Sequence, residues 1–167
     1  FQEEQKYKER LQNRKIAIIG AGGLGQEVIK ALYQNGHRKI VATRRREEEL
    51  RKLQQRYSGI EVTSDNRLAV QQSEVIVLAV KPYALEEVAT ELRSELSSQL
   101  VISLAAGKKL SQLEEWLGYS RVARVMTGLF VAEEMAFYTS GSGCREEDSI
   151  WVKYIFGEET IEVEESL

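Results

Sequence analysis

The sequence predicts an α/β fold: a doubly wound, mostly parallel sheet with helices on both faces, formed by a single domain. Short apolar runs, which suit buried strands, alternate at least five times with segments whose apolar residues recur at helical spacing. The length of 167 residues and the hydrophobic fraction of 43% are sufficient for one ordinary domain with a full core.

The chain is expected to begin with a charged extension at 1–14, because 2–14 is nearly all polar. A segment of this kind fits a solvated, partly formed helix. The domain itself is expected to cover 15–167. Its first element is Ile16–Ile19, a β-branched run that ends at glycines and therefore predicts a buried strand.

The next elements follow the same alternation. Val28, Ile29 and Leu32 lie at helical spacing and predict a helix that ends at Asn35-Gly36. Further strands are expected at 39–43, 60–63, 74–80, 100–104 and 121–126, with helices between them at 46–57, 66–71, 85–96 and 111–117.

Two of these helices carry start signals. Ser64-Asp65 is an N-cap signal, and Ser111 with Glu114 has the spacing of a capping box. Beyond residue 127 the alternation is less regular. We expect a strand at 134–139, a helix at 145–156 and a last edge strand with one solvated face at 160–163.

Composition and charge exclude several classes of function. The net charge of −3, from 23 Lys and Arg against 26 Asp and Glu, gives no support to nucleic-acid binding. No apolar run approaches the roughly 18 residues of a membrane span. One cysteine, Cys144, and one histidine, His37, can form neither an internal disulfide nor a Cys/His metal site. The charged start carries no apolar signal segment, so a cytoplasmic location is expected.

The strongest local signal is Gly20–Gly25, which satisfies G-x-G-x-x-G. A strand precedes it and a helix follows it, as in a dinucleotide-binding βαβ unit, so a Rossmann-like domain is expected. In such a unit the first glycine makes a tight turn, the second admits a pyrophosphate, and the third lets helix and strand pack closely. The N–H groups at the helix start hold the phosphate charge. The alternative is a glycine-rich turn without a ligand.

The end of the second strand indicates which dinucleotide would bind. NAD sites usually carry Asp or Glu there, whereas this chain has Thr43-Arg44-Arg45-Arg46. Guanidinium groups can bind a 2′-phosphate that a carboxylate would repel, so NADP (NADPH) is expected in preference to NAD. The alternative is a basic helix start whose arginines pair with Glu47–Glu49.

The ends of two later strands, Ala79–Pro82 and Leu104–Gly107, should reach the same edge of the sheet. The small residues after Leu104 would let a flat ring lie close to the backbone. Lys81 is expected either to contact a phosphate or ribose or to be solvated.

Four single residues have ordinary structural explanations. His37 lies in a Gly-His-Arg turn and is expected at the surface. Cys144 follows a probable loop, far from any motif, and is not expected to be catalytic. Trp116 and Trp151 flank apolar residues and are expected to anchor packing. No side chain is identified as a catalytic acid or base.

Six segments follow one another in a recognisable order: KIAIIGAGGLG (15–25), ATRRR (42–46), TSDN (63–66), VIVLAVKP (75–82), VISLAAGKKLSQLEEWLG (101–118) and RVARVM (121–126). Together they resemble the amino-terminal, dinucleotide-binding domain of pyrroline-5-carboxylate reductase, over 15–167. The AVKP, SLAAG and LEEWLG portions are more specific than the glycine motif.

The resemblance implies NADPH-dependent reduction of 1-pyrroline-5-carboxylate, a small-molecule substrate, to proline by hydride transfer to the imine carbon, the last step of proline biosynthesis. It implies contacts of Ile19–Leu24 with the pyrophosphate, of Thr43 and Arg44 with the 2′-phosphate, and of Asn66 with the adenosine. Two strand ends would line the ribose and nicotinamide. The residues expected to bind the cofactor are Ile19, Gly20, Ala21, Gly22, Gly23, Leu24, Gly25, Thr43, Arg44, Arg45, Arg46, Asn66, Ala79, Val80, Lys81, Pro82, Leu104, Ala105 and Ala106.

The sequence departs from the family in two respects. After Met126 the family usually continues Pro-Asn-Thr-Pro, beside the nicotinamide and substrate, whereas this chain continues from Thr127 without either proline or the Asn. The family also has a helical C-terminal domain that forms the dimer, and this chain stops where that domain would begin. A dimer partner or a separate helical domain is therefore an expected partner. The alternatives are a dinucleotide-binding protein without reductase activity of its own, and a related reductase with another substrate.

Overall fold

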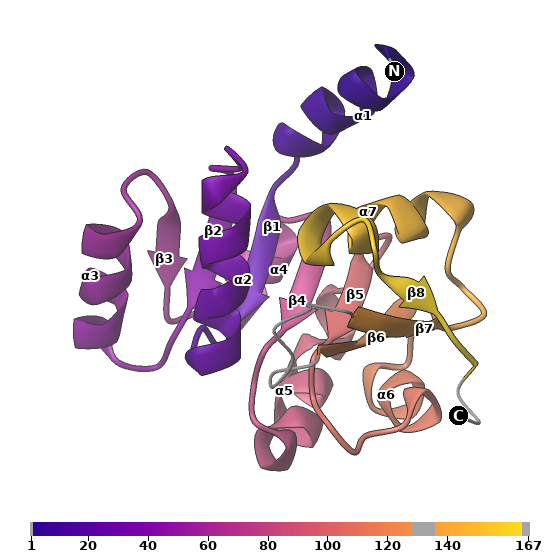
Figure 1. The fold of residues 1–167 in the computed structure, drawn as a ribbon. Coiled ribbons are helices and arrows are strands. Elements are labelled where there is room, and N and C mark those ends of the chain that lie inside the picture. The colour runs from indigo at the N-terminus through magenta and orange to yellow at the C-terminus, as the bar shows by residue number, and fades with distance from the viewer. Residues whose placement is uncertain (1, 128–135, 165–167) are drawn as a thin grey trace.

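The computed structural model describes residues 2–127 and 136–164, which form one eight-stranded sheet covered by helices (Figure 1). The strands are β1 (Ile16–Ile19), β2 (Ile40–Thr43), β3 (Glu61–Thr63), β4 (Val75–Leu78), β5 (Leu100–Ser103), β6 (Val122–Thr127), β7 (Ala136–Ser140) and β8 (Ile161–Glu162). The helices are α1 (Gln2–Gln12), α2 (Gly23–Gln34), α3 (Glu47–Arg56), α4 (Asn66–Gln71), α5 (Leu85–Leu92), α6 (Leu110–Leu117) and α7 (Glu146–Phe156), with short 3₁₀ turns η1 (Pro82–Ala84) and η2 (Arg93–Glu95).

The strand order β3-β2-β1-β4-β5-β6-β7-β8 confirms the predicted doubly wound, mostly parallel sheet. Strands β1 to β6 pair in parallel, β7 is antiparallel to β6, and β8 is parallel to β7. The chain moves outward from β1 through β2 to β3 and then returns to place β4 on the other side of β1. The order therefore reverses between β1 and β4, and ligands of open α/β sheets bind beyond the carboxyl ends of the strands at such a point.

The central strands are apolar throughout because helices cover both of their faces. All four residues of β1 are buried, and side chains alternate between the two faces. Ile16 and Ile18 join one cluster of buried residues, whereas Ala17 and Ile19 join the other.

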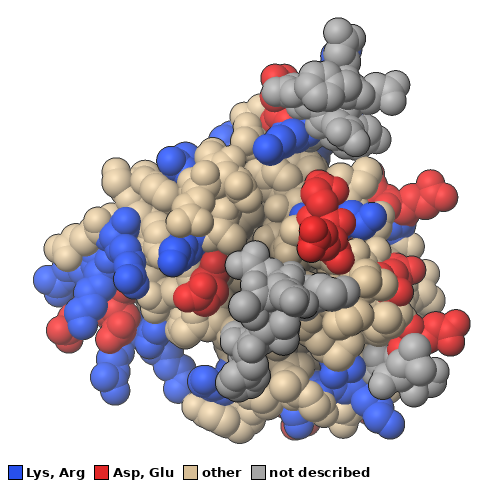
Figure 2. Space-filling model, viewed as in Figure 1, with Lys and Arg blue, Asp and Glu red and all other residues tan. Residues whose placement is uncertain are grey.

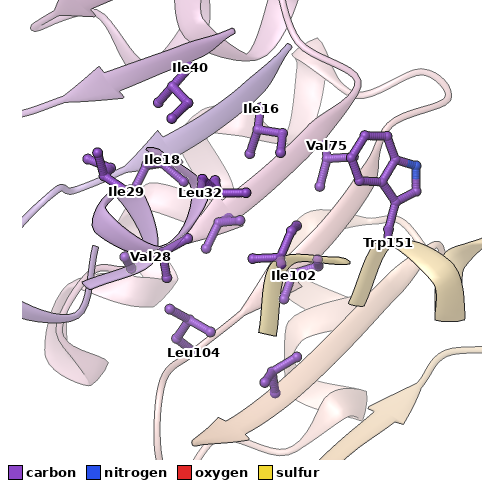
Figure 3. Close-up of a cluster of buried hydrophobic side chains, with 14 of the residues drawn as sticks. Ile16, Ile18, Val28, Ile29, Leu32, Ile40, Val75, Ile102, Leu104 and Trp151 are labelled. Atoms are coloured by element: carbon purple, nitrogen blue, oxygen red, sulfur yellow. The ribbon is translucent and has the colours of Figure 1, made fainter. Parts of the chain in front are cut away.

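The helices divide between the two faces as their apolar stripes require. Val28, Ile29 and Leu32 of α2 pack on the face that also receives α3 and α7, and Figure 3 shows these three side chains facing Ile16 and Ile18. On the opposite face, α4, α5 and α6 contribute buried side chains to the second cluster. Most of the hydrophobic stabilisation therefore comes from two helix layers that share one sheet.

The amino-terminal helix α1 projects from this body (Figure 1). Its contact is concentrated at its carboxyl end, where Leu11 is buried in the cluster beneath α2 and the Gln12 side-chain amide donates to the carbonyl of Asn35 at 3.1 Å. Just beyond the helix, Arg14 forms an ion pair with Glu74. The expected charged extension is thus a helix fixed to the domain at one end.

Three expectations about individual residues are wrong. His37 is fully buried, not on the surface, because its ring is hydrogen-bonded on both sides, by the hydroxyl of Tyr154 and the carbonyl of Lys39. The helix expected to start at Ser111 begins one residue earlier, and the capping contact runs from the Lys109 N–H to the side chain of Gln112. In β8, Ile161 is 43% exposed, so this edge strand is solvated beyond the one face that was expected.

Other expectations hold with small shifts in boundaries. Trp151 is buried and Trp116 packs partly buried against the second cluster, as anchors should. Asp65 caps α4 by accepting from the N–H groups of Arg67 and Leu68, at 3.0 and 3.3 Å. The segment after Thr127 that departs from the expected family pattern, 128–135, lies outside the described residues, as do the first two residues of the strand expected at 134–139.

Candidate functional site

The glycine-rich segment forms the turn between β1 and α2. Gly20 has φ +77°, a left-handed conformation that favours glycine, and a Cβ there would lie 2.5 Å from Cγ1 of Val80. Gly22 is the N-cap of α2, and no side chain caps this helix. The first N–H groups of α2 have no intrahelical partner, so they are oriented toward any anion placed before the helix.

Gly25 holds α2 close to the sheet. A Cβ at this position would meet Cγ2 of Ile18 at 3.1 Å, Cβ of Ala79 at 3.2 Å and the carbonyl oxygen of Gly20 at 3.2 Å. By contrast, a Cβ on Gly23 would meet no atom within 4 Å. A side chain at the third glycine of the motif would therefore crowd its neighbours, whereas the space outside Gly23 is open.

The end of β2 is hydrogen-bonded to this turn. The N–H of Gly20 donates to Oγ1 of Thr43 at 3.0 Å, and the N–H of Ala21 donates to the carbonyl of Thr43 at 2.8 Å. The Arg44 guanidinium donates to the carbonyl of Ala21 at 3.0 Å. We refer to these three hydrogen bonds, among Gly20, Ala21, Thr43 and Arg44, as the clasp.

A second side chain reinforces the clasp from α2. Gln26 donates to the carbonyl of Ala21 at 3.2 Å, and Arg56 of α3 donates to the side-chain oxygen of Gln26 at 3.3 Å. Sequence reasoning missed Gln26, since nothing in its spacing marks it. Its role depends on a turn that brings the first helical turn of α2 back over Ala21.

The arginines after Thr43 differ in their surroundings. Arg44 is half-buried against the glycine turn, whereas Arg45 and Arg46 are exposed. Within 2–127 and 136–164, neither Arg45 nor Arg46 forms an ion pair, so the alternative in which they pair with Glu47–Glu49 is not observed there. Figure 2 shows Lys and Arg side chains gathered at the side of the molecule where α3 lies.

The ends of β4 and β5 reach the same edge of the sheet as the glycine turn, with β4 next to β1 and β5 next to β4. The N–H of Ala79 donates to the carbonyl of Ile19 at 2.9 Å, and the N–H of Leu104 donates to the carbonyl of Leu78 at 3.1 Å. The backbone beyond these strands therefore continues the ladder to the edge of the sheet. Of the expected residues here, Ala79, Leu104 and Ala105 are buried, Val80 is half-buried, and Lys81, Pro82 and Ala106 are exposed.

Asn66 is the first residue of α4 and follows the carboxyl end of β3. It is half-buried and lies beyond β2 and β3, on the side of the site away from β4 and β5. The expected residues thus come from the ends of β1 to β5. Ile19, Ala21 and Thr43 are too deeply buried to offer side chains to a ligand, so these positions present backbone or support.

The titratable groups with shifted pKa values lie away from this edge of the sheet. Burial lowers the pKa of His37 and raises that of Tyr154 to about 12, and both lie beyond the far end of α2. Burial also raises the pKa of the Cys144 thiol, whose Sγ contacts the carbonyl of Val122 at 3.3 Å, so this thiol is not an activated nucleophile.

The described residues contain no group of three or more His, Cys, Asp or Glu side chains that could hold a metal ion. In the same part of the chain, no helix has the length and apolar character needed to cross a bilayer. What the site offers is backbone N–H groups, guanidinium groups and a small-residue edge, which suits binding and orientation of an anionic ligand.

The chain is similar to known proteins over most of its length. Residues 15–107 match the model of a family described as NADP oxidoreductase, coenzyme F420-dependent. Pyrroline-5-carboxylate reductase of Arabidopsis thaliana is 32% identical over 149 residues, which cover 86% of this chain and 54% of the relative. The enzyme of that name from Methanosarcina acetivorans is 37% identical over 145 residues, 83% of this chain and 53% of the relative. The chain spans about half the length of these curated relatives.

Solved structures agree on the fold. A pyrroline-5-carboxylate reductase from Coxiella burnetii superposes with a TM-score of 0.81 at 26% identity, covering 90% of this chain and 58% of that one. Plasmodium falciparum pyrroline carboxylate reductase, solved with NADP bound, gives a TM-score of 0.74 at 21% identity over 92% of this chain and 58% of that one.

Proposed function

This chain belongs to the pyrroline-5-carboxylate reductase family, to whose amino-terminal domain it corresponds, and from that membership we propose that it binds NADPH for the reduction of 1-pyrroline-5-carboxylate to proline. The observation that carries the proposal is the geometry of the glycine turn. A side chain would clash with Val80 at Gly20 and would be crowded at Gly25, the start of α2 has no side-chain cap, and the space outside Gly23 is open.

These residues fit a dinucleotide. The uncapped N–H groups of α2 would hold the pyrophosphate, since a helix start carries partial positive charge and free donors. Any side chain at Gly20 would meet Val80, so glycine lets the turn lie this close to the end of β4. The half-buried Asn66 would lie on the adenosine side.

We propose NADP in preference to NAD because no carboxylate stands at the tip of β2. Arg44, Arg45 and Arg46 follow the end of β2 and would lie near the 2′-phosphate, and guanidinium groups bind phosphate in a fork geometry. Arg44 is already oriented by the carbonyl of Ala21. Arg45 and Arg46 are exposed and free to reach a ligand.

The nicotinamide would lie over the ends of β4 and β5. The bound reduced nicotinamide would supply the hydride to the imine carbon of the substrate. Ala105 and Ala106 leave space for the ring, and the backbone after Ala79 would orient it. As the C=N double bond is reduced, its π electrons pass to nitrogen, which takes a proton. No described side chain at this edge is assigned as the donor.

The test is a binding and turnover measurement on the 167-residue chain. NADPH and NADH are titrated by fluorescence, and NADPH oxidation is followed with 1-pyrroline-5-carboxylate. We expect NADPH to bind more tightly than NADH. If NADPH is oxidised faster with the protein than without it, the chain is a reductase. If neither dinucleotide binds, the proposal is wrong.

A second candidate is a dinucleotide-binding domain without turnover of its own. The observation that favours it is that the titratable side chains with shifted pKa values, among the described residues, lie away from the ends of β4 and β5. A helical domain or a dimer partner would then complete the substrate site, or the substrate would be another imine. Tight NADPH binding without turnover, restored by adding the second half of a relative, is the result that this candidate predicts.

A further inference from the structure

The side chain of Thr43 stands at the tip of β2, where a dinucleotide-binding domain recognises the ribose. Its position suggests contact with the ligand, yet the residue is only 2% exposed. Its Oγ1 accepts the N–H of Gly20 at 3.0 Å, inside the protein. The residue therefore offers almost no surface to a 2′-phosphate, and its hydroxyl oxygen already serves the glycine turn.

The clasp joins two segments that are 23 residues apart in the sequence. Thr43 supplies two of its three bonds, one through its hydroxyl and one through its carbonyl, which accepts from Ala21. The hydroxyl bond falls on Gly20, the residue held at φ +77°. Loss of that acceptor would leave a partly buried N–H without a partner at the sharpest point of the turn.

The other side of the turn is supported by packing. Val80 lies against Gly20, so close that a Cβ on the glycine would be 2.5 Å from its Cγ1. Gly20 is thus held by Thr43 from β2 and by Val80 from the end of β4. The conformation of the turn fixes the N–H groups that face the pyrophosphate.

We infer that Thr43 is a positioning residue: its hydroxyl shapes the pyrophosphate-binding turn and does not bind the 2′-phosphate. The inference rests on the proposed function, because the ligand it concerns is a dinucleotide. The hydrogen bond between Gly20 and Thr43 is present in the protein without any ligand. Arg44, Arg45 and Arg46 then distinguish NADP from NAD. Thr43 contributes equally to the binding of both dinucleotides.

The test compares Thr43→Val, which keeps the shape and removes the hydroxyl, with Thr43→Ser, which keeps the hydroxyl. We expect Thr43→Val to weaken the binding of NADPH and the binding of NADH by the same factor. Loss of the one hydrogen bond that orders the turn should raise each dissociation constant about tenfold. Thr43→Ser should bind both as the wild type does. Adenosine 2′-monophosphate, which lacks the pyrophosphate, should bind equally to all three proteins.

A readout without ligand separates this inference from the proposed function. Amide hydrogen exchange at Gly20 should be faster in Thr43→Val than in the wild type, and unchanged in Thr43→Ser. Arg45→Gln is the matched control, expected to weaken NADPH alone and to leave exchange at Gly20 unchanged. If Thr43→Val weakens NADPH and adenosine 2′-monophosphate but not NADH, Thr43 is a 2′-phosphate ligand and the inference is wrong. If the wild type binds no dinucleotide, the proposed function fails, and the exchange result still decides the role of the hydrogen bond.

Discussion

Arg121 and Asp148 form a two-pronged ion pair that fixes the start of α7 to the sheet. Nη2 of Arg121 lies 2.6 Å from Oδ1 of Asp148, and Nε lies 3.0 Å from Oδ2. Asp148 also accepts the backbone N–H of Arg145 at 2.8 Å, so one buried carboxylate both pairs with the arginine and caps the helix. The pair connects the residue before β6 to a helix 27 positions later in the chain.

Replacing Asp148 with Ala should destabilise the protein strongly. The substitution leaves the Arg121 guanidinium, whose side chain is 12% exposed, without its main partner. Removal of one member of a buried pair costs about 3–5 kcal/mol, which urea unfolding would detect as a lower midpoint. Glu147→Gln is the control: its carboxylate is 57% exposed, so its ion pair with Arg121 should contribute under about 1 kcal/mol. Equal effects of the two substitutions would contradict this account.

The stability of the protein should fall as the pH drops below 6.5. Burial is the main cause that lowers the pKa of His37, against the backbone carbonyls of Lys39 and Arg14, which raise it, and the Lys39 charge, which lowers it further. Since the unfolded histidine takes up a proton first, stability is full above pH 6.5 and is lost as the pH falls through the folded pKa. The Lys39 carbonyl can only accept, so Nε2 donates to it at 3.1 Å and Nδ1 accepts the hydroxyl of Tyr154 at 2.9 Å. Protonation of Nδ1 would reverse that second bond, because Nδ1 would then donate and the Tyr154 hydroxyl would have to accept.

The measurement is the free energy of unfolding from pH 7.5 to 5.5. His37 is the single histidine of the chain, so His37→Gln should flatten the slope in this window. Tyr154→Phe is the companion variant, because it removes the hydroxyl but keeps the titrating ring. It should lower stability at pH 7.5 and retain a slope. A slope that survives His37→Gln would show that another group is responsible.

The opposite pH dependence is expected from Tyr154 in alkali. Burial raises its pKa to about 12. The unfolded phenol, with the ordinary pKa of about 10, ionises first, so stability is full below pH 10 and declines as the pH rises toward 12. Ultraviolet absorbance at the phenolate band, compared between wild type and Tyr154→Phe, would identify the late-titrating group. If Tyr154→Phe removes an early-titrating phenol instead, the prediction is wrong.

Gly20→Ala should be more destabilising than a substitution at an ordinary left-handed glycine. Both backbone strain and contact with Val80 oppose a side chain at Gly20, and a strained position costs roughly 1–3 kcal/mol on its own. Gly59→Ala is the matched control, since Gly59 has φ +93° but would meet no atom within 4 Å. The difference between the two variants in the midpoint of thermal unfolding measures the effect of the contact with Val80. Equal decreases in the midpoint would show that Val80 does not oppose a side chain at Gly20.

Arg45→Gln and Arg46→Gln should each change the preference between the two dinucleotides. A hydrogen bond to a charged phosphate contributes roughly 1.5–3 kcal/mol, so loss of one contact should raise the dissociation constant for NADPH about tenfold or more. The constant for NADH should not change. Lys30→Gln, an exposed cation on α2, is the control and should leave both unchanged. Titrations at two salt concentrations would distinguish a direct contact from a general charge effect.

The central part of the sheet could be predicted from sequence because β1, β2, β4 and β5 are buried on both faces. Runs such as Ile16–Ile19 are apolar at every position, and few other elements of that length have this composition. The glycine motif was equally informative, since Gly20 and Gly25 are restricted by contacts within one βαβ unit. Local patterns of this kind do not depend on distant partners.

The residues that sequence reasoning misjudged are those whose partners lie far along the chain. His37 looked like a turn residue because the hydroxyl that holds it belongs to Tyr154, 117 positions later. For Thr43, nothing in the sequence indicated the bond to Gly20, because that bond forms only when β2 is placed beside β1. Polar residues are ambiguous in sequence, since the same hydroxyl can face a ligand or satisfy a backbone N–H.

The two ends of the sheet have a consequence for how the protein behaves at high concentration. At one border lies β3 with three residues, and at the other lies β8 with two. An exposed border offers its unpaired backbone groups to strands of other molecules, and a short border offers few of them. A foreign strand that paired with β3 or β8 would gain only a few hydrogen bonds, and Glu61 and Glu162 place negative charge in its path. Among the described strands, the four that are buried at every position, β1, β2, β4 and β5, lie inside the sheet, so its two borders offer little backbone for edge-to-edge association.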